Sequence, residues 1–233
     1  MKPKPLIVVL CLDNHPKSDD INNPLFTALA KKDVVCKART VPEARRYLTS
    51  TTRPHAILVV DAAVSSFEYR EVLLRLAEYA RAGGTVIYAG TSTVSKFELE
   101  STFKDVWDLP WRASTYTNGI YTVNPRVRGI HTNGLARSYS VKATLVENVA
   151  SENAVYLPPS SPSTLPKGGG SSAGETYQTP AAFATVGRGQ DNATWRTKYV
   201  ILISFLSWPE RTDSSQSSLL LFLNKMNYAY TLI

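Results

Sequence analysis

The first hundred residues alternate short apolar runs with segments of helical periodicity. Four apolar runs predict buried strands, and their lack of internal alternation is typical of strands covered on both faces. They are Leu6–Leu12, Val34–Ala38, His55–Asp61 and Thr85–Ala89. Repeated strand–helix–strand units joined by short loops predict a doubly wound, largely parallel sheet.

Helix-start signals stand between these strands. In a capping box, a Ser or Thr side chain and a glutamate three residues later bond the first backbone N–H groups of a helix. Such boxes begin at Thr40, Ser65 and Ser95, and Asn23-Pro24 predicts a start before residues 25–31. We expect each predicted strand to lead into a helix.

The helix expected after Ser65 has the clearest apolar face. Its apolar positions recur at helical spacing; they are Val72, Leu73, Leu76, Tyr79 and Ala80. Gly83-Gly84 ends the pattern, and we expect Gly84 to take the left-handed conformation of a helix stop.

The second half of the chain favours strands. Ile120–Val123 and Ser140–Leu145 alternate apolar and polar residues, and Ala181–Val186 with Tyr199–Leu206 predicts a strand pair. Thirteen of the eighteen residues in Pro158–Glu175 are Pro, Ser or Gly, so residues 158–178 are expected to form a mobile loop within a single domain, 1–233. A final apolar helix is expected at Ser217–Met226.

Composition and charge limit the functional classes to which the protein can belong. The formal charge of +7 allows an acidic partner such as nucleic acid, although a mildly basic globular protein is the simpler interpretation. Cys11 and Cys36 lie in predicted strands without metal-ligand or redox spacing, so no metal or cofactor is predicted. The chain has neither a signal-peptide pattern nor an apolar run near the ~20 residues that a membrane helix needs, so we expect an intracellular, cytoplasmic protein without membrane contact.

Two segments together resemble a known family. Pro54–Gly90 (PHAILVVDAAVSSFEYREVLLRLAEYARAGGTVIYAG) has a strand ending in Asp, a helix, a Gly-Gly and a second strand. Thr179–Gly189 (TPAAFATVGRG) is similar to a late hairpin of the same group. Both segments resemble the ThuA-like and other class I glutamine amidotransferase-like domains, and Leu135–Val149 resembles a segment of uncharacterised fungal proteins of that superfamily. The resemblance implies a three-layer, flavodoxin-like α/β fold with helices on both faces and a pocket at the carboxyl ends of the strands.

The same resemblance argues against amidotransfer. Working amidotransferases place a thiolate at the turn after the corresponding strand and pair it with a downstream His and Glu, because a thiolate must attack the amide carbon. Here that turn reads Tyr88-Ala-Gly-Thr-Ser92, and the sequence has no His beyond His131. The resemblance therefore implies a fold without its usual nucleophile.

A candidate ligand pocket nevertheless follows from the strand ends. Asp13 and Asp61 each end a predicted strand, so both should face the crevice at the carboxyl edge. With them we place Gly90, Thr91, Ser92 and Trp111. Ser92 with His131 or His15 and Asp61 could form a hydrolytic triad, but no nucleophile elbow supports it, and capping of local backbone donors is the simpler role for both Asp residues.

A second candidate surface lies between Leu109 and Val146, which contain no Asp or Glu. Basic residues alternate there with aromatic ones; they are Arg112, Arg126, Arg128, Arg137 and Lys142, with Trp111, Tyr116, Tyr121 and Tyr139. Such a pattern can follow phosphates and stack bases, although tyrosine in strands is also ordinary sheet packing.

Three functional hypotheses remain. The first is a catalytically silent amidotransferase-like domain that binds an unknown protein or small molecule. The second is a hydrolase or sugar-modifying enzyme with an unusual site at the strand-end crevice. The third is a basic protein associated with nucleic acid.

Overall fold

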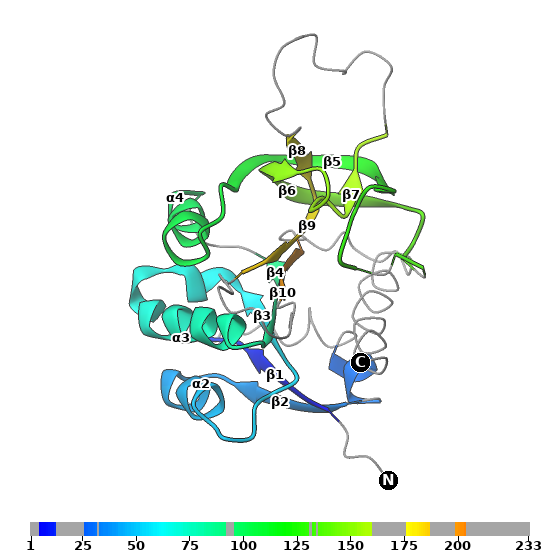
Figure 1. The fold of residues 1–233 in the computed structure, drawn as a ribbon. Coiled ribbons are helices and arrows are strands. Elements are labelled where there is room, and N and C mark those ends of the chain that lie inside the picture. Colours follow the sequence, from blue (N-terminus) through cyan, green and yellow to red (C-terminus); the bar gives the residue numbers. More distant parts are fainter. Residues whose placement is uncertain are drawn as a thin grey trace, which may run out of the picture.

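A computed structural model describes the following residues of the chain: 5–12, 26–31, 33–91, 96–130, 132–133, 135–159, 176–186 and 199–203. They form a mixed α/β structure with two sheets (Figure 1). None of the helices in these ranges is long and apolar enough to cross a membrane. The predicted helix Ser217–Met226, the helix starts at Asn23 and Ser95, and residues 160–175 of the predicted loop lie outside the described ranges.

The first sheet has six strands in the order β2-β1-β3-β4-β10-β9. Their bounds are Leu6–Leu10 (β1), Val34–Ala38 (β2), Ala56–Asp61 (β3), Thr85–Thr91 (β4), Ala181–Thr185 (β9) and Tyr199–Ile203 (β10). The first five strands in this order are parallel, and β9 alone runs antiparallel, against β10. The parallel part is consistent with the flavodoxin-like order, so the predicted parallel α/β sheet is confirmed.

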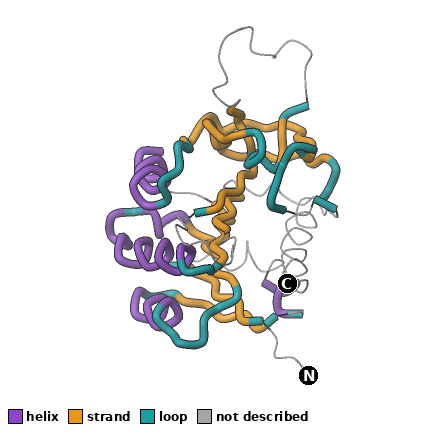
Figure 2. The backbone as a smooth tube through the Cα atoms, in the orientation of Figure 1, coloured by secondary structure: helices purple, strands orange, loops and turns teal. Residues whose placement is uncertain are grey.

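One face of this sheet carries the helices that follow β2, β3 and β4. They are α2 (Val41–Leu48), α3 (Arg70–Arg81), α4 (Lys96–Ser101) and the π-helical turn η3 (Thr102–Val106), and Figure 2 shows them along one side of the strands. The predicted cap of α2 is present, since the Thr40 hydroxyl accepts from the Glu43 N–H at 3.4 Å. The Glu43 carboxylate accepts from the N–H of Arg39 at 2.7 Å, so the reciprocal bond goes to the residue before the cap rather than to Thr40.

The opposite face packs partly against other strands rather than only against helices. Residues 26–30 form a short helix there, and Phe26 and Leu29 join the same apolar cluster as Val9 and Leu58. That cluster also contains Tyr121, Val141 and other residues of the second sheet. The described helices therefore lie mainly on one face, and the second sheet contributes to the covering of the other.

The second sheet is antiparallel, with the order β7-β5-β6-β8. Its strands are β5 (Arg112–Val123), β6 (Ser138–Ala150), β7 (Tyr156–Leu157) and β8 (Thr176–Thr179). β5 and β6 extend well beyond the predicted segments Ile120–Val123 and Ser140–Leu145. In β5 the added residues 112–119 are mostly small or polar, which weakens the strand signal. Thr176–Thr179 belongs to β8, so the predicted loop 158–178 is wrong at its carboxyl end, where Tyr177 pairs with Val149.

Two local predictions around α3 are also wrong. Ser65 does not cap α3: it ends the 3-10 turn η1 (Ala62–Ser65), a second turn η2 (Phe67–Tyr69) follows, and α3 begins at Arg70 without a side-chain cap. The left-handed residue after α3 is Gly83 (φ 108°), not Gly84. The Gly84 N–H donates to the Tyr79 carbonyl at 2.8 Å and the Gly83 N–H to that of Ala80 at 2.9 Å, which is the Schellman pattern.

Buried tyrosines in the second sheet should make its stability fall at alkaline pH. The Tyr156 ring packs edge-on against Tyr139 with centroids 4.5 Å apart, and the Tyr156 hydroxyl donates to the Ala136 carbonyl at 3.0 Å. Burial raises the pKa of Tyr156 from 10.0 to about 12 and raises that of Tyr139 as well. Because the folded-state pKa lies above the unfolded one, the Tyr156 phenol contributes stability that is fully present below pH 10. This contribution is lost as the pH rises from 10 through the folded-state pKa of about 12.

We therefore expect the free energy of unfolding to fall above pH 10, and to fall less steeply in Tyr156→Phe. Urea unfolding at neutral pH and at about pH 11 measures the difference. Parallel losses in the wild type and in Tyr156→Phe would show that this phenol does not drive the alkaline transition.

Candidate functional site

The carboxyl edge of the first sheet has a switch point between β1 and β3. The helix after β1 (residues 26–30) packs on one face, whereas α3, which follows β3, packs on the other. The chain therefore leaves these two neighbouring strands in opposite directions, and the space just beyond them is where open α/β sheets bind ligands.

Asp61 occupies this switch point. It is the last residue of β3, its side chain is buried, and its Oδ2 accepts a hydrogen bond from the Leu12 N–H at 2.6 Å. The Tyr69 hydroxyl donates to the Leu12 carbonyl at 3.4 Å. Side chains from β3 and η2 thus hold both backbone polar groups of the residue that follows β1. The sequence predicts that Asp61 caps local donors, but the Leu12 donor is 49 residues away in the sequence.

The sheet also brings the end of β4 to Asp61. Thr91 is the register partner of Asp61, after an irregularity in the pairing beyond Val59. Gly90 precedes Thr91 in β4, so three of the six predicted pocket residues share one edge of the sheet. Asp13 and Ser92, which complete the predicted strand-end group, lie outside the described residues.

Trp111 has a different position from its predicted partners. Its side chain is only 2% exposed, and its ring packs edge-on against Phe103 with centroids 5.9 Å apart. Phe103 belongs to η3, so Trp111 closes the core between that turn and the start of β5. The structure gives Trp111 a packing role. Its sequence context, between Pro110 and Arg112, does not indicate that role.

The other nucleophiles and potential ligands are scattered. Cys11 is buried just after β1, and Cys36 is half-buried in β2. Within the described ranges, no three His, Cys, Asp or Glu side chains gather as metal ligands would. The prediction that the chain needs no metal stays a prediction, since Asp13, His15 and His131 are outside those ranges.

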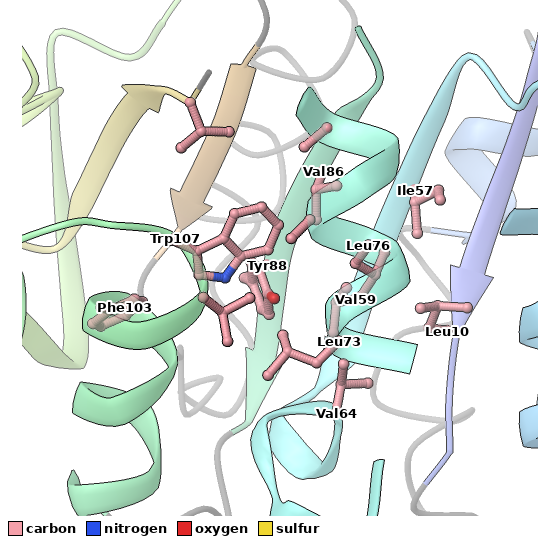
Figure 3. Close-up of a cluster of buried hydrophobic side chains, with 14 of the residues drawn as sticks. Leu10, Ile57, Val59, Val64, Leu73, Leu76, Val86, Tyr88, Phe103 and Trp107 are labelled. Carbon is pink, nitrogen blue, oxygen red and sulfur yellow. The ribbon is translucent and has the colours of Figure 1, made fainter. Parts of the chain in front are cut away.

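Tyr88 fills the interior immediately before the strand-end turn. It packs edge-on against Trp107 with ring centroids 6.1 Å apart, and Figure 3 shows both rings between β4 and the turn η3. Burial raises the pKa of the Tyr88 phenol far above its usual value. Among the described residues, neither the Tyr88 hydroxyl nor the Trp107 indole N–H has a well-formed hydrogen bond; the indole N–H faces the hydroxyl and offsets only a small part of the pKa increase that burial causes.

Replacing Tyr88 by phenylalanine should therefore leave the free energy of unfolding unchanged or raise it by up to about 1 kcal/mol, because a buried hydroxyl without a well-formed hydrogen bond contributes mainly its desolvation cost. Urea unfolding followed by intrinsic tryptophan fluorescence measures this. A loss of about 2 kcal/mol would instead show that this hydroxyl donates to a group beyond the described ranges.

The basic and aromatic segment 109–146 forms most of β5 and β6. Two of its tyrosines are inside the sheet: Tyr121 is 4% exposed, and Tyr139 packs against Tyr156. Tyr116 is 52% exposed, and the Lys142 ammonium lies 5.5 Å from its ring centroid. The sequence pattern thus marked the correct strands but overestimated how many aromatic rings reach the surface.

The solved structures that are similar to this one include two neighbours at low identity. A ThuA-like protein from Bacteroides uniformis ATCC 8492 aligns over 97% of this chain and 91% of its own, with 10% identity and a TM-score of 0.57. The mmIFT52 N-terminal domain aligns over 95% and 97%, with 8% identity and a TM-score of 0.48. No family model matches the sequence, and no curated protein is detectably similar to it. The first neighbour supports the ThuA-like fold that the sequence resemblance implied.

Proposed function

We propose that this chain is a catalytically silent, class I amidotransferase-like domain that acts as a protein-interaction or ligand-binding module. The observation that carries the proposal is the hydrogen bond from the Leu12 N–H to Asp61 Oδ2 at 2.6 Å. A buried carboxylate that accepts a backbone N–H at the switch point stabilises the junction of two strands. That use competes with a role as a base or a nucleophile, because the oxygen is already bonded.

The residues beside Asp61 support the same conclusion. Gly90 and Thr91 end β4 where a working amidotransferase would need a thiolate. The cysteine nearest to this edge, Cys11, is only 2% exposed, and a reactive thiol needs access to its substrate. A hydrolase or sugar-modifying enzyme with its site at Asp13, Asp61 and Thr91–Ser92 is the alternative that the experiment below addresses.

The test is a turnover assay on the full chain. Glutaminase activity is followed as ammonia release, and general hydrolase activity with p-nitrophenyl esters and glycosides. We expect rates equal to those of an Asp13→Ala/Ser92→Ala variant. Release of ammonia or p-nitrophenol by the wild type, lost in that variant, would overturn the proposal in favour of the hydrolase.

Origin and location belong to the same proposal. The similarity of Leu135–Val149 to fungal proteins supports a fungal origin, and an intracellular, cytoplasmic location is proposed with it. Imaging of a carboxyl-terminal fluorescent fusion in a yeast host tests the location, and a secreted fusion would contradict it.

A further inference from the structure

The second sheet has a face that its own core does not use. Three register pairs define the β5–β6 outer face: Tyr116 with Thr144, Asn118 with Lys142, and Ile120 with Ser140. The intervening pairs point inward, where Val141 and Ala143 are buried. The alternation along both strands therefore separates a packed face from an outer one.

Two large apolar side chains stand on this outer face. Tyr116 is 52% exposed and Ile120 is 59% exposed, although both belong to the middle of a twelve-residue strand. They are four residues apart on one strand, so their Cα atoms are about 13 Å apart. Asn118 lies between them, and small polar residues face them from β6. An apolar centre with a polar surround is the usual composition of a protein-binding patch.

The charge around this face is mainly positive. Between Leu109 and Val146 there is no acidic residue, and every basic residue of that segment is exposed: Arg112, Arg126, Arg128, Arg137 and Lys142. Arg112 begins β5, whereas the other three arginines lie where β5 and β6 are connected, so cations stand at both ends of the face. The nearest acidic residue along β6 is Glu147, the register partner of Arg112.

We propose that the β5–β6 outer face docks an acidic polypeptide segment that inserts apolar side chains between the basic ends of the face. This inference rests on the proposed function and specifies its surface and its partner. Opposite charge would attract the segment and set its register, and Tyr116 with Ile120 would supply the buried contact. Single-stranded nucleic acid is less favoured, because a base-stacking platform needs successive exposed rings and only Tyr116 of the three tyrosines in these strands is largely exposed.

The experiment measures binding of fluorescent probes to the full chain by anisotropy. The probes are a random copolymer of glutamate and tyrosine, polyglutamate, and an oligodeoxythymidylate. The first variant, Tyr116→Thr/Ile120→Thr, removes the apolar centre but keeps β-branched residues in the strand. The second, Lys142→Gln, removes one cation and serves even where the first variant folds poorly.

Matched controls come from outside the second sheet. Phe67→Ser removes a side chain that is 85% exposed on η2, and Lys104→Gln removes an exposed cation of η3. Each control matches the chemistry of one test variant without touching the second sheet. Circular dichroism and melting curves establish that all four variants are folded.

We expect the copolymer to bind more tightly than polyglutamate, since only the copolymer offers apolar side chains. The Tyr116→Thr/Ile120→Thr variant should weaken copolymer binding about tenfold. Lys142→Gln should weaken the binding of both the copolymer and polyglutamate, and the two controls should leave binding unchanged. No copolymer binding, or binding that is indifferent to both test variants, would overturn the inference. Tighter binding of the oligodeoxythymidylate, lost in the same variants, would also overturn it and identify a nucleic-acid surface. Turnover by the wild type would refute the proposed function and is scored independently of these polymers.

Discussion

Gly84→Val should lower the free energy of unfolding by about 3 kcal/mol, because it forces a side chain into a space that is already filled. A Cβ at Gly84 would overlap Cε1 and Cζ of Tyr79. The ring cannot easily move away, since the Tyr79 hydroxyl donates to the Pro54 carbonyl at 2.9 Å in a buried bond. Urea unfolding followed by circular dichroism measures the loss.

Two comparisons isolate the cause of this loss. Gly83→Ala places a Cβ on a left-handed backbone and should lower the free energy of unfolding by only about 1 kcal/mol. In a Tyr79→Leu background, the ring is absent, so the added cost of Gly84→Val should shrink by at least about 1 kcal/mol. If Gly84→Val cost no more than Gly83→Ala, the steric explanation would be wrong.

Asp61→Ala should lower the free energy of unfolding by about 2–3 kcal/mol, because it leaves the buried Leu12 N–H without its charged acceptor. The amide proton of Leu12 should also exchange faster with solvent. Hydrogen exchange read by NMR, with urea unfolding on the same samples, measures both effects.

Asp61→Asn is the conservative control. Its amide oxygen can still accept from the Leu12 N–H, so it should recover about half of the lost stability and most of the protection of that amide. Equal losses in Asp61→Ala and Asp61→Asn would show that the negative charge, not the hydrogen bond to Leu12, is what stabilises this edge.

The parallel part of the fold could be predicted from the sequence because its signals are local. The continuous apolar runs of β1 and β3 indicate strands buried on both faces, and the box from Thr40 to Glu43 marks the start of α2. In β5 and β6 the signal is weaker. Residues 112–119 of β5 are mostly small or polar and resemble loop composition, so only the most apolar parts of these strands were predicted.

The candidate site was predictable only in part, for a different physical reason. An Asp at the end of a strand indicates a carboxylate at the sheet edge, and Asp61 lies there. The donor to Asp61, the Leu12 N–H, is set by the pairing of β1 with β3. That pairing joins segments far apart in the sequence, so no local pattern predicts it. The choice between Gly83 and Gly84 is similar, because the Tyr79 ring, five residues earlier, decides which glycine tolerates no side chain.

The contacts at the end of α3 also bear on how the chain folds. The Tyr79 hydroxyl bonds the Pro54 carbonyl, and Arg53 donates to the Ala82 carbonyl at 2.8 Å, so the segment before β3 is fastened to the end of α3. These bonds close a loop of 25 to 29 residues, whereas the bond between Leu12 and Asp61 spans 49. Shorter loops close at a lower entropic cost, so the β3–α3–β4 unit is the expected folding nucleus, with β1 joining it later.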